Sequence, residues 1–226
     1  MPVPQNFYRR LLQLPLFQGF SEADYLEMAA KVRLNFQTLQ AGKTIIRQGS
    51  PCKSYIFIVG GDFCVTHHND SPFYMLHEWF SMPALLGAEN LYGLRQRYAY
   101  SATTKSVVTL FEVSKDMVFN VLMNYEVFRM NYMNLLSYYS QTRRDKLWLS
   151  HPSLLQERFA AFLSYRCLRP AGHKRLHIRQ TSLAAELLAT LRNVSLMLQN
   201  LEKRQLLHHG RGFIDVPRFE KLVQEV

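Results

Sequence analysis

Arg192 and Asn193 stand where an apolar series begins near the C-terminal end of the chain. The series repeats at intervals of three and four residues, as one buried face of a helix requires, and consists of Val194, Met197, Leu198 and Leu201. Ser195 and Gln199 fall one turn apart on the opposite side. Arginine can bond guanine edges, and asparagine can bond adenine edges, in the major groove of DNA. These residue types and their spacing indicate a helix that could read bases.

A second group of polar residues could contact the phosphate backbone. Arg179, Gln180 and Thr181 come at the start of an earlier amphipathic segment. The free N–H groups of a helix N-terminus favour a phosphate at such a place. We expect Thr181 or Ser182 to cap this helix. Arg211 lies at the tip of a predicted hairpin, where it could reach the DNA backbone or the minor groove.

Two helices, a tight turn and a hairpin are the elements that must position these side chains. The first helix covers residues 181–187 and the second covers the apolar series. Residues 208–216 supply two short strands around a glycine turn. Together these elements form a winged helix-turn-helix, a module that places its second helix in the major groove.

The charge of the chain is consistent with a polyanionic partner. The 226 residues carry a formal net charge of +10. Residues 148–226 contain 12 Lys or Arg and 6 Asp or Glu, whereas residues 1–147 contain 15 and 11. Basic side chains that neutralise phosphates release condensed counterions, so a basic C-terminal third favours nucleic acid.

The composition disfavours several classes of protein. Cys52, Cys64 and Cys167 show no CxxC spacing, so no metal cluster or disulfide framework is expected, and a reducing cytoplasm is the simpler location. No apolar run approaches the length of a membrane span, and the N-terminus lacks the apolar core of a signal peptide. No Ser-His-Asp, paired-carboxylate or metal-ligand arrangement stands out, so an enzyme is not expected.

The rest of the chain forms three predicted segments. Residues 7–36 have a helical pattern, with Ser21 as an N-cap. Residues 36–113 consist of short β-type runs separated by turns, which is typical of a β-sandwich or barrel. Residues 115–149 are predicted as one long helix. A hinge is expected at residues 150–153, because Pro152 disfavours helix at the residue before it.

The long predicted helix has a broad apolar surface. Phe128, Tyr132, Leu135 and Tyr139 recur at spacings of four, three and four. We expect one side to pack on the β domain and another on the same helix of a second chain, which would make a homodimer. The alternative is a helix buried wholly within its own chain.

Three motifs accompany this order of elements: LPLFQGFS at residues 14–21, AGKTIIRQG at residues 41–49 and YIFIVGG at residues 55–61. The motifs and the order resemble the cAMP receptor protein/fumarate-nitrate regulator (CRP/FNR) family of bacterial transcription factors. The resemblance implies an α+β fold with three parts: a cyclic-nucleotide-binding-like β-roll with N-terminal helices at residues 1–114, a dimerisation helix at 115–149 and a winged helix-turn-helix at 150–226. Double-stranded DNA is the implied partner. RNA polymerase and an unidentified small-molecule effector are further partners that the resemblance leaves open.

In cyclic-nucleotide-binding members of the family, a Gly-Glu pair and an Arg-Ser/Thr pair hold the ligand, and the Arg grips the cyclic phosphate. The matching segments here are Gly87-Ala88-Glu89 and Arg97-Tyr98-Ala99. Counted without gaps, the Glu position holds Ala88 and the Arg position holds Tyr98. A shift of one residue in a strand turns a side chain to the opposite face, so Arg97 cannot replace the missing arginine. We therefore expect that cAMP does not bind.

Two other cofactors of the family can be compared with the residues present. An iron–sulfur sensor needs four cysteine ligands, and this chain has three dispersed ones. A haem sensor needs a His, Cys or Met ligand, and His67, His68, His77, Met75 and Met82 lie in or near the β-roll. Paired histidines at a hairpin tip are more often solvated loop residues. No cofactor is therefore evident, and haem stays an open alternative.

The family's recognition helix follows a turn glycine and reads Ser/Thr-Arg-x-x-x-Ser/Gly-Arg. Here Thr190 and Ser195 match the family pattern, whereas Leu188 occupies the glycine position. The two arginine positions hold Leu191 and Leu196. The resemblance thus implies a recognition helix with an altered set of base contacts.

Two functions remain in competition. The first is a homodimeric, sequence-specific regulator that binds a two-fold symmetric DNA site. The second is a degenerate member that acts as a protein-interaction or ligand-sequestering module with weak DNA binding. Exposed side chains at Leu188, Leu191 and Leu196 would form an apolar patch suited to a protein partner. Burial of all three would favour the DNA reader.

Overall fold

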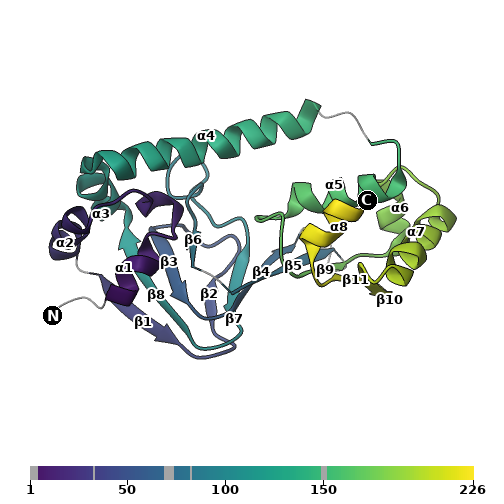
Figure 1. The fold of residues 1–226 in the computed structure, drawn as a ribbon, viewed down its shortest axis with the longest axis horizontal. Helices are drawn as coiled ribbons and strands as arrows, with labels where there is room; N and C mark the ends of the chain where they lie inside the picture. Colours follow the sequence, from purple (N-terminus) through teal and green to yellow (C-terminus); the bar gives the residue numbers. More distant parts are fainter. Residues whose placement is uncertain (1–4, 33, 69–73, 82, 149–151) are drawn as a thin grey trace. The chain divides into compact units, whose positions relative to one another are not determined.

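The computed structural model describes residues 5–32, 34–68, 74–81, 83–148 and 152–226 (Figure 1). The contacts within the chain define two compact units. Unit 1 comprises Met1–Phe63 and Ser81–Leu147, and unit 2 comprises Cys64–Phe80 and Trp148–Val226. None of the described helices is both long enough and apolar enough to cross a membrane.

Unit 1 begins with helices α1 (Gln5–Leu11), η1 (Pro15–Phe17) and α2 (Glu22–Lys31). The predicted cap at Ser21 is confirmed. The Asp24 N–H donates to Ser21 Oγ and the Ser21 N–H donates to Asp24 Oδ2, both at 3.1 Å. This reciprocal pair satisfies two N–H groups that the first turn of a helix leaves free.

The sheet of unit 1 is antiparallel and has the strand order β1-β8-β3-β6 (Figure 1). Its strands are β1 (Asn35–Leu39), β3 (Ser54–Gly60), β6 (Ala84–Leu86) and β8 (Val108–Ser114). Outside this four-stranded sheet, β2 (Thr44–Ile46) pairs with β7 (Ser101–Thr104) in antiparallel register. The inner residues of β3 are buried without the alternation of a one-faced strand, and Phe57 stacks on Phe111 of β8 at 4.8 Å. The predicted β-rich region is therefore confirmed.

The helical region after β8 is interrupted, contrary to the prediction of one helix over residues 115–149. It forms α3 (Lys115–Asn120), η2 (Leu122–Asn124) and α4 (Glu126–Trp148). The Asn124 side chain donates to the Asn120 carbonyl at 2.6 Å. In a continuous α-helix, this carbonyl would accept from the backbone N–H of Asn124 instead. Such a side-chain bond competes with the helical ladder and accounts for the break.

Helix α4 buries two of the residues that were expected at a dimer interface. Phe128 and Tyr132 lie in the core of unit 1, where Phe128 packs on Phe17 and Tyr132 packs on Tyr55. For these two residues the intramolecular alternative is correct, because their rings fill space beneath the N-terminal segment and β3. Leu135 and Tyr139 are partly buried. The exposed apolar side chains of α4 are instead Met130, Met133, Tyr138 and Trp148.

Unit 2 contains the predicted winged helix-turn-helix. Its elements are α5 (Leu155–Arg166), β9 (Lys174–His177), α6 (Gln180–Glu186), α7 (Leu191–Lys203), β10 (His208–Gly210), β11 (Phe213–Val216) and α8 (Phe219–Glu225). The two strands predicted around the glycine turn are β10 and β11, which pair in antiparallel register. Of the expected hinge at 150–153, Ser150 and His151 lie outside the described residues.

The hairpin of β4 (Phe63–His68) and β5 (Met75–Phe80) departs from the predicted domain of residues 1–114. Almost all of it belongs to unit 2, where the strand order is β10-β11-β9-β5-β4. Strand β5 pairs with β9 from Met75↔His177 to Glu78↔Lys174, and Leu76 joins the hydrophobic core of the unit. This backbone pairing and the burial of Leu76 explain why the hairpin is part of the C-terminal unit.

Candidate nucleic-acid interface

Helix α7 presents a buried face and a polar face as its sequence predicts. Val194, Met197, Leu198 and Leu201 are buried in the core of unit 2. Thr190 is the N-cap, and its hydroxyl accepts a hydrogen bond from the Asn193 N–H at 3.2 Å. Arg192, Asn193 and Gln199 are exposed, and Ser195 is partly buried. The candidate base-reading side chains therefore lie on the solvent side of α7, while Thr190 fixes where the helix begins.

The turn between α6 and α7 has a left-handed residue at Leu188, a conformation typical of glycine. Leu188 has a φ of 49°, in the left-handed region that bulky residues rarely adopt. The Ala189 N–H donates to the Ala184 carbonyl at 2.9 Å. Arg158 of α5 reinforces the turn, because its Nη1 donates to the Leu187 and Leu188 carbonyls at 2.9 and 3.4 Å. Leu188 thus adopts a backbone conformation that glycine reaches with less strain.

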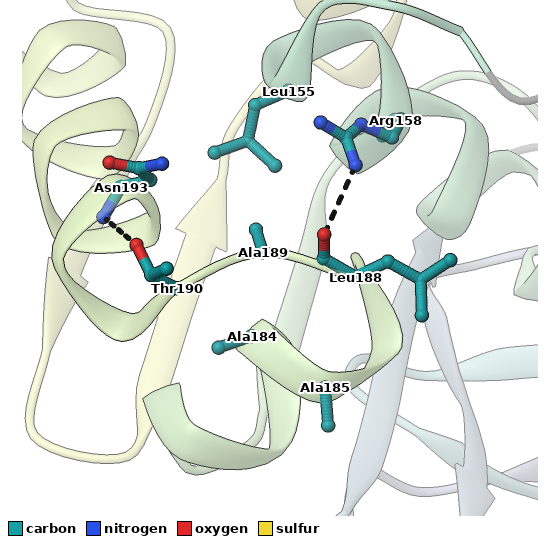
Figure 2. A pocket seen from close by; sticks show the side chains of 8 residues that line it. All are labelled: Leu155, Arg158, Ala184, Ala185, Leu188, Ala189, Thr190 and Asn193. Carbon is teal, nitrogen blue, oxygen red and sulfur yellow. Dashed lines mark hydrogen bonds between the residues drawn. The ribbon is translucent and has the colours of Figure 1, made fainter.

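Figure 2 shows the residues that line an open pocket beside this turn, from α5, α6 and the start of α7. It has a volume of about 480 Å³, and Arg158 and Leu155 lie on its α5 side. The Leu188 side chain extends away from Thr190 and Asn193. The sequence did not predict a role for Arg158, because nothing in the pattern of an amphipathic helix indicates that one of its arginines binds the carbonyls of a distant turn.

A groove brings together the residues that were predicted as phosphate contacts. Its volume is about 800 Å³. The lining residues come from the start of α6, the start of α7 and the turn between β10 and β11, and they are Arg179, Gln180, Thr181, Leu191, Gly210, Arg211 and Gly212. Arg179 and Arg211 therefore lie along one concave surface, although they are far apart in the sequence. The two arginines give this concave surface a positive charge.

The N-cap of α6 lies two or three residues before the predicted cap at Thr181 or Ser182. Arg179 is the N-cap position, and Thr181 and Ser182 lie inside the first turn. The helix starts early because the Ile178 N–H donates to the Gly212 carbonyl at 3.1 Å, which ties the preceding residue to the wing. Thr181 and Ser182 are exposed there, so their hydroxyl groups face solvent at the helix N-terminus.

The exposed face of α7 is cationic. Within the described residues, no ion pair or hydrogen bond engages the side chains of Arg192, Lys203 or Arg211. The carboxylate of Glu202 turns toward the wing, where its Oε1 accepts from the His209 N–H at 3.1 Å. Lys203 was not predicted as a contact. Lys203 comes three helical turns after Arg192, and this spacing could have predicted that both lie on the same face of α7.

Two basic residues on the sheet of unit 2, His173 and Arg175, contact a carboxylate of the same unit. Asp215 accepts from Arg175 Nε at 2.7 Å and lies 2.8 Å from His173 Nε2. Burial alone would raise the pKa of Asp215, but His173 and Arg175 together hold it below its ordinary value of 3.8. Asp215 therefore remains ionised and neutralises charge on the sheet, whereas Arg192, Lys203 and Arg211 have no such partner among the described residues.

The predicted effector segment occupies the β-rich part of unit 1. Tyr98 is buried, and its hydroxyl donates to the Ser54 carbonyl at 3.2 Å. Its ring leaves no room at Gly87, where a side-chain carbon would come within 2.8 Å of Tyr98 Cε1. Arg97 is exposed and donates to the Gly49 carbonyl at 2.7 Å. Tyr98 and Arg97 thus face opposite ways, as the one-residue shift predicts.

The remaining residues of this segment offer no replacement for the arginine. Ala88 is buried, Ala99 is exposed and Glu89 is partly buried. The buried Tyr98 ring fills the space beside Gly87, and its hydroxyl is held by the Ser54 carbonyl. Burial raises the pKa of Tyr98 well above its ordinary value of 10.0, so its hydroxyl is neutral.

The histidines considered as haem ligands already take part in hydrogen bonds. His67 Nε2 lies 2.9 Å from Glu78 Oε1, and His77 Nδ1 lies 2.9 Å from Thr66 Oγ1. Met82 lies outside the described residues. Across the described part of the chain, no three His, Cys, Asp or Glu side chains gather as a metal ion requires.

Comparison with known proteins adds evidence from structures alone. No family model matches the chain. No curated protein matches it either. The solved structure of the catabolite activator protein from Thermus thermophilus is 18% identical, with a TM-score of 0.52, over 93% of this chain and 98% of that one. The N-terminal domain of a transcriptional regulator from Streptomyces coelicolor A3(2) is 16% identical, with a TM-score of 0.51, over 62% of this chain and 96% of that one. The chain therefore has the α+β fold of the catabolite activator protein structure, as the CRP/FNR resemblance implies.

Proposed function

We propose that this chain is a DNA-binding transcription regulator of the CRP/FNR type, in which α7 enters the major groove. The observation that carries the proposal is the groove in which Arg179, Thr181 and Arg211 flank the start of α7. A helix with exposed polar residues and phosphate-binding groups beside it suits duplex DNA. The names of the two similar structures, an activator protein and a transcriptional regulator, agree with this function.

The geometry suggests a division of roles on the interface. Arg192, Asn193 and Gln199 are exposed on α7, near the base edges of a docked duplex. Arg179 and Arg211 lie in the groove, where they would hold phosphates. Base contacts specify a sequence, whereas phosphate contacts strengthen binding to every sequence.

A homodimer is the proposed form of the regulator. Met130, Met133 and Tyr138 are exposed on α4, and a second copy of this helix would cover them. A two-fold dimer would place two α7 helices on half-sites that are about one helical turn, roughly 34 Å, apart. Because Tyr98 aligns with the arginine that grips the phosphate in cyclic-nucleotide-binding members, we propose that cAMP is not the signal. RNA polymerase and an effector of other chemistry remain proposed partners.

Salt-dependent binding of duplex DNA by the full-length chain tests the proposal. Affinity should fall as salt rises, because each neutralised phosphate releases counterions. Arg179→Ala should weaken binding to all sequences alike and reduce the salt slope by about one. Arg192→Ala should weaken binding to the selected sequence more than to random duplex. Lys105→Ala, which removes an exposed basic residue of unit 1, is the matched control and should change neither.

Two outcomes would count against the proposal. Equal losses on selected and random duplexes for both arginine variants would refute the division of roles. Absence of salt-dependent binding would refute the function itself.

A second candidate function is favoured by one observation. Leu188, Leu191 and Leu196 are 71%, 47% and 54% exposed, so the burial expected of a DNA reader is not found. An exposed apolar patch suits a protein-interaction or ligand-sequestering module with weak DNA binding. The cations beside these leucines favour DNA, and salt-dependent duplex binding discriminates between the two functions.

A further inference from the structure

The exposed leucines of α7 are not needed by the core of unit 2. Four apolar residues of α7 already cover that core, on the opposite side of the helix from Arg192 and Gln199. Leu191 and Leu196 are both about half exposed. Exposed apolar side chains on a helix gain free energy only when another molecule covers them. Their position on α7 therefore points to a ligand.

The surroundings of these leucines identify the kind of ligand. Leu196 lies four residues after Arg192 and three residues before Gln199, on the face of α7 that also carries Lys203. Leu191 lines the same groove as Arg179 and Arg211. An apolar protein partner would have to desolvate these cations, whereas a nucleic acid would pair them with phosphates. The charge complementarity favours duplex DNA over a protein.

Only one base offers an apolar group in the major groove. Thymine presents its C5-methyl group there, and no other base of DNA does so. A leucine side chain has no donor or acceptor, so the methyl group is the feature it can distinguish. We propose that Leu191 and Leu196 read thymine methyl groups, and that this chain selects thymine where related readers would use arginine to select guanine. This inference rests on the proposed function and names the sequence chemistry of the same site.

Replacement of thymine by deoxyuridine isolates the methyl group. It preserves pairing and backbone charge and removes only the methyl group that is attached to C5. A full-length sample would be titrated against its best duplex from a random pool, with each thymine of a half-site replaced in turn. Loss of one buried methyl contact should weaken binding about fourfold at one or two positions per half-site.

Matched variants assign each position to a side chain. Leu196→Ala should bind the thymine duplex more weakly and lose its sensitivity to uridine at one position, and Leu191→Ala should do the same at another. Alanine preserves the helix, which circular dichroism would verify. Leu168→Ala is the control, because Leu168 is 44% exposed but lies outside α7, and it should keep the full sensitivity.

Three results would overturn the inference. Unchanged affinity with uridine at every position would refute it. Unchanged uridine sensitivity in both α7 variants would also refute it, and this second result is expected if the leucines bind a protein partner. In these two cases salt-dependent DNA binding would persist, so the proposed function would survive. Absence of DNA binding at any salt concentration would reject the proposed function together with the inference.

Discussion

Replacing Lys174 by methionine should destabilise unit 2, because it leaves a buried carboxylate without its counter-ion. Lys174 and Glu78 are 1% and 0% exposed, and Lys174 Nζ lies 2.9 Å from Glu78 Oε2. At that separation and an effective dielectric constant of about 20, the attraction is about 6 kcal/mol. Methionine avoids the desolvation cost of the ammonium group, so only part of this attraction is a net loss.

The other partners of Glu78 place the expected loss at the lower end of the usual range. Its Oε1 accepts from the Leu168 N–H at 2.8 Å and lies 2.9 Å from His67 Nε2, and both contacts survive in the variant. Breaking a buried pair commonly costs about 3–5 kcal/mol, and we expect about 3 kcal/mol at pH 7.

The pH dependence of the loss has a definite sign. Burial alone would raise the pKa of Glu78, but His67, Lys174 and the Leu168 N–H hold it below 4.5 in the native chain. The native carboxylate therefore stabilises the fold above this value, and that stability is lost as the pH falls through the folded pKa. Without Lys174 the burial effect should prevail and raise the pKa of Glu78 in the folded state. The variant should then recover stability relative to the native chain as the pH falls from neutral toward 4.5.

Urea denaturation with tryptophan fluorescence measures this effect. The chain has two tryptophans. Trp79 stacks on His173 in unit 2 at 4.1 Å, so a Trp148→Phe background makes it the single probe. His67→Gln in parallel samples removes the second titrating partner of Glu78. Glu186→Gln, which breaks the partly exposed pair with Arg166, is the control and should cost less than about 1 kcal/mol. A loss below about 1 kcal/mol for Lys174→Met, constant with pH, would refute the reasoning.

Three further predictions concern the turn, the long helix and the effector segment. Leu188→Gly should stabilise unit 2 by about 0.5–1 kcal/mol, since glycine relieves the left-handed strain at φ 49°, and a lower midpoint of unfolding would contradict this. Phe128→Ala should destabilise unit 1 by about 3–5 kcal/mol, because the ring is fully buried. Met133 is exposed, so Met133→Arg should weaken self-association in sedimentation experiments and leave the stability of unit 1 unchanged. A destabilised Met133→Arg variant, or a stable Phe128→Ala variant that no longer associates, would be inconsistent with the structure. Calorimetry with cAMP should detect no binding, because Tyr98 is buried and uncharged and Arg97 is exposed; micromolar affinity would show that Arg97 can turn inward.

Local patterns predicted the elements that depend on neighbouring residues. The spacing of Val194, Met197, Leu198 and Leu201 set the buried face of α7, and Ser21 set the start of α2. The glycine turn of the wing follows from the same kind of local signal. These features depend on helical periodicity, capping and turn chemistry, each of which acts within a few residues.

Long-range contacts account for what the sequence did not predict. Pairing of β5 with β9 places β5 in unit 2, and no local pattern indicates that Glu78 would meet Lys174. Arg158 supports the helix-turn-helix turn through carbonyl groups on another element. At the candidate site the residues at 179–181 and at Arg211 were predicted separately, and only the fold shows that they share a groove.

Selection of bound sequences from a random duplex pool tests the central claim most directly. If α7 reads the major groove as a pair of copies, the full-length chain should enrich a two-fold symmetric sequence with half-sites centred about 10 base pairs apart. Recovery of unenriched, random sequences at every salt concentration would contradict the claim that this chain is a sequence-specific regulator.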